Sequence, residues 1–492
     1  METTDSVDIK AVGKDDRAIE RRNTFWVFFI LGALVLISLI YAGVNIYYTY
    51  LVVYIWFGLA YGMMLQAGRF CMASASRDLF AAGVPRMAVG IMVALIFFSL
   101  VQAILHATDM STFHPAPFGI HMTISGIIFG IGMVLAGGCA SGTLYKVGEG
   151  NGTSMLGLFG ICFGQAIFVI AGGPLRALLP ESWIKASEAT IAARGIPAEY
   201  AQSWFDVYLT GYIWQKPVYQ ISQLSFVKNH FKGASAYFVG DALINSIIPA
   251  IVLLLIIYAL YVRKGFIKKV RKKKGGSGLG DELRGFWGMI TASQRTTLMG
   301  VLVGITAGLH IWVLAGMQKK FAITNFGQLL TKMGHPEDVS LFGTVFDPGY
   351  WYITSQEAQF AAWVMEKLGI DMRHNIFFGV NNGIPELWRN PALWMSIGII
   401  LGAMVMSLIN KEFKWKAPKG ELIVFGLLGG FLMGMGSRPS LGCNVGAFFI
   451  RVAGGDPNGW LYFVGMATGA FIGVKFFNWY TERKMAKQME AF

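Results

Sequence analysis

The chain has 492 residues, of which 54% are hydrophobic and only 14% are charged. A soluble domain usually carries about 25% charged residues, so the composition places most of this chain in a lipid bilayer. The formal net charge of +13 is concentrated in short basic segments beside apolar ones, above all at 263–274. This placement is typical of a membrane protein and argues against nucleic-acid binding. The four cysteines also lie in or beside apolar segments, so no disulfide framework is expected.

Apolar segments follow one another along most of the chain. A helix needs roughly 20 apolar residues to span a bilayer. The tail 1–24 has six acidic side chains and no cleavage pattern, so the first apolar run is a retained helix and not a signal peptide. We predict an all-α integral membrane protein with about ten transmembrane or half-membrane helices. The ten segments are 25–46, 50–66, 86–106, 121–137, 153–178, 242–262, 296–315, 391–410, 421–436 and 458–479.

The basic segments predict the orientation of these helices. Placing 263–274, with its eight Lys and Arg residues, in the cytoplasm also places both termini and the lysine-rich segment 411–419 there. We therefore predict a multi-pass protein of the inner (plasma) membrane with cytoplasmic N- and C-termini. The predicted regions are a tail (1–24), a first repeat core (25–178), an outside loop or cap (179–241), a repeat junction (242–317) with the basic loop 263–295, a second outside cap (318–390), a second repeat core (391–480) and a tail (481–492).

Two glycine-rich breaks interrupt apolar segments. The break Gly132–Gly150 contains Cys139, and the break Gly434–Ala447 contains Cys443, each within a Gly-Cys-x-x-Gly pattern. Broken helices at matching positions of two halves mark the substrate site of many transporters. Because the predicted crossings run through the two breaks in opposite directions, we predict an inverted five-plus-five repeat.

Two weaker patterns accompany the breaks. The run Gly68–Cys71 is echoed by the run Lys319–Ala322, where a methyl group replaces the thiol. Glycines also recur every fourth residue on two segments, and we expect these stripes to allow close helix packing. The stripes are Gly300, Gly304 and Gly308, and Gly426, Gly430 and Gly434.

Three motifs together resemble the YeeE/YedE family of membrane proteins, over roughly 50–178 and 296–480 of the chain. They are the run Gly68–Cys71 followed by Arg77-Asp78, the break Gly132–Gly150, and the run Gly442–Ala447. That family includes thiosulfate uptake carriers and proteins linked to selenium and sulfur metabolism. The resemblance implies an hourglass-shaped path lined by one cysteine from each motif. These cysteines are Cys71, Cys139 and Cys443, with Cys139 the most critical.

Such residues suit the chemistry of thiosulfate, a divalent anion with a soft terminal sulfur and hard sulfonate oxygens. Conduction of an anion needs several weak binding sites in succession, because a single tight site would not release the anion. Neutral thiols are weak donors, and backbone N–H groups at the ends of broken helices add positive potential. The predicted path residues are Cys71, Cys139, Cys443, Gly138, Ser141, Gly142, Gly442, Asn444 and Gly446.

Charged residues near the motifs have two interpretations. Arg69, Lys146 and Arg438 are placed near the membrane interfaces, where they attract anions or form ion pairs, such as Lys146 with Glu149. Cys162 matches no motif and is interpreted as a structural residue. The sequence has no metal-ligand spacing, nucleotide-binding loop or nucleophile elbow. We therefore expect no metal site, no cofactor and no catalytic residue.

Three functions remain open at this point. The first is uptake of a sulfur-containing anion, thiosulfate by resemblance, passed intact between thiols. The second is a membrane sulfur or selenium transferase in which Cys139 forms a persulfide. The third is a scaffold that hands sulfur to a soluble cytoplasmic sulfur-carrier protein. We prefer the first, a non-enzymatic transporter whose partners are thiosulfate or a related sulfur or selenium anion and the lipid bilayer, and not nucleic acid.

Overall fold

The computed structural model describes residues 9–201, 203–274, 278–335, 353–418 and 420–490. Helices make up 80% of the structure, and no strand occurs among the described residues. This confirms the predicted all-α class.

Nine helical stretches in these ranges are long and apolar enough to cross a membrane. They coincide with nine of the ten predicted segments. The tenth, 421–436, is α20 (Glu421–Ser437), whose 17 residues reach about 26 Å, slightly less than the roughly 30 Å hydrocarbon core. The nine stretches contain residues 19–44 of α1 (Ile9–Val44), α2 (Thr49–Gly68), α4 (Arg86–Ala107), α5 (His121–Leu135) with α6 (Ala140–Gly148), α7 (Gly152–Ile170), the run η6 (Tyr237–Ile247), α13 (Ile248–Ile257), η7 (Tyr258–Val262) and α14 (Arg263–Lys274) as far as Lys273, then α16 (Gln294–Phe321), α19 (Pro391–Ile409) and α22 (Asn458–Glu490).

Shorter helices connect or interrupt the long ones. Helix α3 (Met72–Ala82) follows α2, and η11 (Asn444–Ile450) follows α20 and continues as α21 (Arg451–Ala453). These short helices adjoin the candidate site. The others are η1 (Ile46–Tyr48), α8 (Gly173–Arg176), α9 (Glu181–Ala193), η2 (Ala198–Ala201), α10 (Trp204–Val207), η3 (Tyr208–Tyr212), η4 (Ile213–Gln215), η5 (Ile221–Gln223), α11 (Ser225–His230), α12 (Ala234–Ala236), α15 (Leu279–Thr291), α17 (Phe326–Lys332), α18 (Thr354–Lys367), η9 (Ile376–Asn382) and η10 (Leu387–Arg389).

Helix pairs with backbone contact form the core. Helix α2 packs on α19, α4 on α16, α5 on α22, and α20 on both α5 and α7. A Cβ atom at Gly304 would collide with the Ala94 carbonyl of α4, and one at Gly430 with the Gly157 carbonyl of α7. The predicted glycine stripes are therefore confirmed as packing surfaces, because only glycine lets these helices approach so closely.

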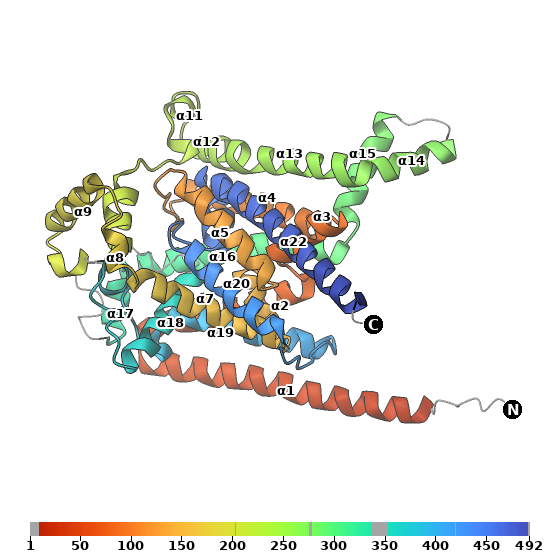
Figure 1. Cartoon of the computed structure of the whole chain (residues 1–492), viewed down its shortest axis with the longest axis horizontal. Coiled ribbons are helices and arrows are strands. Elements are labelled where there is room, and N and C mark those ends of the chain that lie inside the picture. The colour runs from red at the N-terminus through yellow and green to blue at the C-terminus, as the bar shows by residue number, and fades with distance from the viewer. Residues whose placement is uncertain (1–8, 202, 275–277, 336–352, 419, 491–492) are drawn as a thin grey trace.

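The two ends of the bundle carry different segments. In Figure 1 the start of α1, the pair α14–α15 and the end of α22 lie at one end, which we call the basic end. Helices α8, α9, α17 and α18 lie at the opposite end, which we call the cap end. The lysine-rich segment joins the basic end, because Lys411 pairs with Glu20 of α1 at 3.3 Å. This arrangement agrees with the predicted grouping of the basic segments.

The two long loops predicted to lie outside pack on each other at the cap end. The structure has short helices there, and their apolar side chains and those of α7 bury one another in a hydrophobic cluster separate from the main core. Phe205 and Phe378 are completely buried in it. We call this the cap cluster, formed by Cys162, Ala166, Val169, Ile191, Ile196, Tyr200, Ala201, Phe205, Leu209, Ile213, Ala358, Ala361, Ala362, Met365, Met372, Ile376, Phe377, Phe378, Val380 and Ile384.

Helix α7 is shorter than the predicted segment 153–178. It ends at Ile170, and Gly172 then adopts a φ of 127°. The side chain of Trp204 occupies the space where a Cβ of residue 172 would lie. The cap cluster therefore begins directly after this helix.

Candidate functional site

The two predicted breaks have the same local geometry. After α5, Gly137 adopts a positive φ of 70°, and Cys139, in extended conformation, caps the start of α6. After α20, Leu441 adopts a φ of 55°, and Cys443, again extended, caps the start of η11. A left-handed residue redirects the chain after a helix. Each cysteine consequently lies at the N-terminus of a new helical segment.

A second sulfur atom meets Cys139. Helix α2 is followed by Arg69, which has a φ of 54°, and Cys71 then caps α3. The Sγ atoms of Cys71 and Cys139 lie 3.8 Å apart, and both side chains are buried. Gly142 permits this contact, because a Cβ atom there would collide with the Cys71 sulfur and lie only 3.1 Å from the Cys139 sulfur.

A small cavity of about 40 Å³ adjoins the Cys71 thiol. Ser141 and Asn444 line it from the two breaks, and Ser141 Oγ lies 3.7 Å from Cys139 Sγ. Asn444 Nδ2 donates to Met72 Sδ at 3.2 Å, whereas its Oδ1 accepts no hydrogen bond from the part of the chain that the structure describes. We call this the central cavity, lined by Leu65, Phe70, Cys71, Met72, Ile91, Ser141, Val303, Asn444, Val445 and Phe449.

Cys443 belongs to the same buried region. Its Sγ accepts the Val445 N–H at 3.4 Å. The neighbouring Gly446 has open space where a Cβ would lie, with no atom of another part of the chain within 4 Å. The buried hydroxyl of Tyr462 interacts electrostatically with Cys139 and with Cys443 and has no hydrogen-bond partner among the described residues. The thiols of the two breaks therefore share one polar neighbour, Tyr462.

A charged cavity of about 310 Å³ lies at the basic end. Arg69 pairs there with Glu412 at 3.0 Å, and the buried amide of Gln66 donates to Glu412 and to Glu149. Lys146 donates to a backbone carbonyl of the first break, so the ion pair with Glu149, one of the two predicted alternatives, is not formed. We call this the basic-end cavity, lined by Arg69, Glu149, Asn151, Lys411, Glu412, Lys414 and Lys416.

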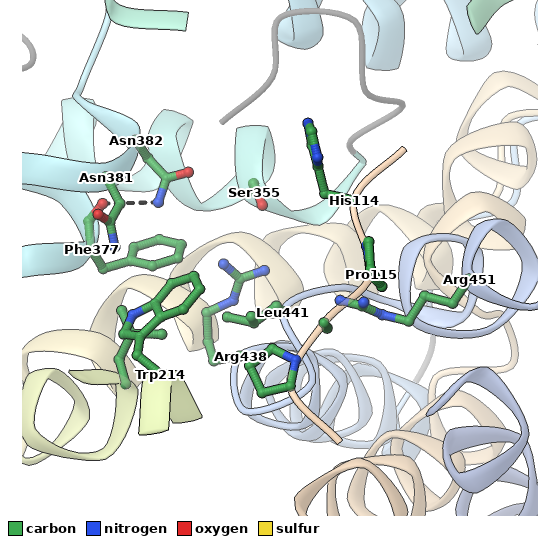
Figure 2. Close-up of a pocket in the computed structure, with 13 residues that line it drawn as sticks. His114, Pro115, Trp214, Ser355, Phe377, Asn381, Asn382, Arg438, Leu441 and Arg451 are labelled. Carbon is green, nitrogen blue, oxygen red and sulfur yellow. Dashed lines mark hydrogen bonds between the residues drawn. The ribbon is translucent and has the colours of Figure 1, made fainter. Parts of the chain in front are cut away.

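A third cavity, of about 140 Å³, lies at the cap end beside Arg438. This side chain is only 1% exposed, and its predicted place near a membrane interface stays a prediction. Residues of the two long loops, among them Leu209 and Phe377, line the same cavity and shield Arg438 from solvent. Arg451 is 4% exposed and reaches the same space (Figure 2). We call this the cap-end cavity, lined by His114, Pro115, Ala116, Pro117, Leu209, Trp214, Ser355, Phe377, Asn381, Asn382, Arg438, Leu441 and Arg451.

The structure brings together predicted path residues from distant parts of the chain. Gly138 and Gly442 occupy equivalent places, each directly before a capping cysteine. Three neighbours of the site were not predicted, because each lies in or at the start of a regular helix, where one polar or sulfur-containing side chain carries no distinct signal. They are Gln66, Met72 and Tyr462.

Helices that break beside buried thiols, between polar cavities at the two ends of an apolar bundle, define the class of multi-pass membrane transporters. Residues 67–472 match the family model described as sulphur transport. This match spans most of the chain, so the protein belongs to that family, which includes the YeeE/YedE proteins.

Relatives of the chain carry transporter names. It is 24% identical over 406 residues to the thiosulfate transporter TsuA of Spirochaeta thermophila, covering 82% of this chain and 92% of the relative. It is also 24% identical over 420 residues to the thiosulfate transporter TsuA of Escherichia coli K12, covering 84% and 91%. These names agree with the prediction of a non-enzymatic membrane protein.

Proposed function

We propose that this protein carries thiosulfate, intact, across the membrane along a path that passes Cys443, Cys139 and Cys71. The observation that carries the proposal is the 3.8 Å contact between the Cys71 and Cys139 sulfurs, beside a cavity that residues of both breaks line. The relatives named thiosulfate transporters, aligned over 92% and 91% of their lengths, support thiosulfate as the substrate.

The predicted inverted repeat accounts for the way in which the helices pair. In such a repeat α2, α4, α5 and α7 correspond to α16, α19, α20 and α22. The pair α2–α19 then corresponds to α16–α4, and the pair α5–α22 corresponds to α20–α7. All four pairs are in contact, as are the self-related pairs α2–α16 and α5–α20. This pattern supports two halves related by an axis in the membrane plane.

The ends of α2 and α16 support the same correspondence. Arg69 and Ala322 follow these helices with φ angles of 54° and 51°. In this register Cys71 corresponds to Thr324, and not to Ala322 as the echo in the sequence suggested. The third thiol of the path, that of Cys71, then occurs in the first half only. Its counterpart in the second half is the hydroxyl of Thr324.

Several weak contacts suit a soft dianion better than one strong contact. A neutral thiol donates a weak S–H hydrogen bond, and the N-termini of α6 and η11, which start after Cys139 and Cys443, add the positive potential of helix ends. Weak sites in succession permit release. The central cavity of about 40 Å³ between end cavities of about 140 and 310 Å³ suits the hourglass-shaped path that we propose.

Cations in or near the two end cavities gather the anion. We assign this role to Arg69 and Lys146 at the basic end and to Arg438 at the cap end. The positive-inside rule assigns the basic end to the cytoplasm, so that both termini lie inside an inner (plasma) membrane and uptake runs from the cap end to the basic end. A soluble cytoplasmic sulfur-carrier protein that meets the basic end stays a prediction.

Purified protein in liposomes tests the proposal. Thiosulfate labelled separately at its terminal and central sulfur atoms should appear inside the liposomes with the two labels still joined. In the alternative function, the Cys139 thiolate would attack the terminal sulfur, form a persulfide and release sulfite. Sulfite release, with a mass increment of one sulfur atom on Cys139 and no intact thiosulfate inside, would establish the transferase and refute the carrier.

A further inference from the structure

A fourth cavity, of about 640 Å³, lies at the basic end between α1 and the end of α19. It is larger than the central, basic-end and cap-end cavities, and it falls within the range of about 300–1,000 Å³ that is typical of sites for small molecules. The proposed thiosulfate path does not use it. We call it the α1 groove, lined by Ile19, Arg22, Asn23, Trp26, Met404, Leu408, Lys411, Phe413, Lys414 and Trp415.

Helix α1 lies along the outside of the bundle (Figure 1), and its buried apolar residues begin only beyond the groove. Ile30 and Leu34 are buried in a small apolar cluster with residues of α2 and α19. Nearer to the start of α1 the contacts are polar. Asn23 Nδ2 donates to the Leu408 carbonyl at 3.1 Å, and an ion pair joins the start of α1 to Lys411. The two walls of the groove are therefore joined by polar contacts, and side chains of the described chain leave the space between them open.

The groove changes from cationic to apolar with depth in the membrane. The candidate span that contains α1 starts at Ile19, so Arg22 lies near the membrane surface, and Trp26, four residues on, lies about 6 Å deeper. On the opposite wall the two lysines follow the span formed by α19, whereas Met404 and Leu408 belong to it. Basic side chains beside tryptophan are typical of the lipid headgroup region. A ligand that fits this groove has an anionic head and an apolar tail.

The cations of the groove outnumber the acidic residues that pair with them. One of the three pairs with Glu20 at 3.3 Å. Within the described residues no ion pair involves the side chain of Arg22 or of Lys414, and both side chains are exposed. The neighbouring Glu412 pairs with Arg69 and not with these cations. Three cations and one carboxylate leave a net charge of +2 for an anion from outside the chain.

We propose that the α1 groove is a binding site for an anionic phospholipid, whose phosphate lies between Arg22 and Lys414 and whose acyl chain lies along Trp26 and Met404. A guanidinium binds two phosphate oxygens through parallel N–H bonds, and each cation near the membrane surface strengthens the binding of an anionic lipid. A free phosphate would leave the apolar wall uncovered, and a zwitterionic lipid would bring a further cation to a cationic groove. The bound lipid joins the start of α1 to the bundle, where the chain supplies mainly polar contacts.

Native mass spectrometry of the purified full-length protein in detergent tests the site, with phosphatidylglycerol and phosphatidylcholine as probes. The unmodified protein should bind phosphatidylglycerol more tightly by about fivefold or more. The double variant Arg22→Gln/Lys414→Gln should lose about 25-fold in affinity for phosphatidylglycerol, because each cation contributes about fivefold. The matched control Lys264→Gln/Lys268→Gln removes two exposed lysines of α14 at the same end, outside the groove, and should bind like the unmodified protein.

Glu20→Gln tests the site in the opposite direction. Without the carboxylate that pairs with Lys411, phosphatidylglycerol should bind about fivefold more tightly, a gain that damage to the fold would not produce. Unchanged or weaker binding by this variant would overturn the site, even where the double variant of the groove unfolds at a lower temperature.

Two comparisons with the unmodified protein complete the experiment. Equal affinity for the two lipids, or equal losses in the two double variants, would overturn the anionic lipid site. Glycerol 3-phosphate, which has the anionic head without the acyl chains, should bind about tenfold or more weakly than phosphatidylglycerol, because it cannot cover the apolar wall. Binding of glycerol 3-phosphate as tight as that of the whole lipid would show a site for free anions and would refute the lipid as the occupant.

Discussion

The contact between the Cys71 and Cys139 sulfurs depends on the absence of a side chain at Gly142. A Cβ atom at this position would overlap the Cys71 sulfur and lie 3.1 Å from the Cys139 sulfur. Ordinary contact distances are about 3.5–4.0 Å. The variant Gly142→Ala therefore forces the Cys139 sulfur to move by about 0.5 Å and the Cys71 sulfur by more.

The magnitude follows from two opposing effects. Overpacking of a close-packed core costs about 1–3 kcal/mol, whereas alanine in place of a helical glycine contributes about 0.5–1 kcal/mol of stability. The net loss for Gly142→Ala is therefore about 1–2 kcal/mol. We expect a lower unfolding temperature and loss of most thiosulfate uptake, because the two thiols no longer meet across the path.

Two glycine variants serve as matched controls in the same assays, which are thermal unfolding of the purified protein and uptake into liposomes. Gly446→Ala fills open space beside Cys443, so it should keep the unfolding temperature and slow uptake by narrowing the path. Gly288→Ala lies on an exposed face of α15 with no atom near its Cβ position, and should leave uptake unchanged. Uptake by Gly142→Ala equal to that of Gly288→Ala would refute the role assigned to the thiol contact.

Three shorter predictions concern the same residues and the cap. Cys139→Ser should abolish uptake and Cys162→Ser should leave it near normal, since only Cys139 contacts Cys71, which lines the central cavity; equal tolerance at both positions would refute the cysteine path. Mild oxidation should link Cys71 to Cys139, whose sulfurs are 3.8 Å apart, and stop uptake until a reductant is added; inhibition that persists in Cys71→Ser would point to another target. Phe205→Ala should destabilise the cap cluster by about 3–5 kcal/mol, which limited proteolysis of the 179–241 segment should reveal; an unchanged cleavage rate would contradict the burial of this ring.

Local patterns were sufficient to locate the two breaks. A capping cysteine preceded by glycine and followed three residues later by another glycine is a short-range feature, and the helix starts at Cys139 and Cys443 follow from it. Apolar length alone likewise located nine spans. Helix breaks and apolar spans depend on residues that are close together in the chain, so they can be predicted from a single sequence.

The burial of Arg438 could not be predicted in this way. In the sequence it is an arginine in a glycine- and serine-rich loop, which is typical of a membrane interface. Two loops that lie far away in the sequence cover it, and their apolar residues carry no pattern that says what they cover.

The sequence by itself determined that this is a membrane protein of apolar helices, with two glycine-flanked cysteines at broken segments, because hydropathy and helix termination act within one segment. Only the tertiary structure decided which sulfurs meet, which arginine is buried and where the cavities lie. Cys71 and Cys139 are 68 positions apart in the chain, and Arg438 and Thr354 are 84 apart. Contacts at such separations arise from the packing of whole helices on one another, and their distances are set by backbone approach at glycines that no short segment specifies.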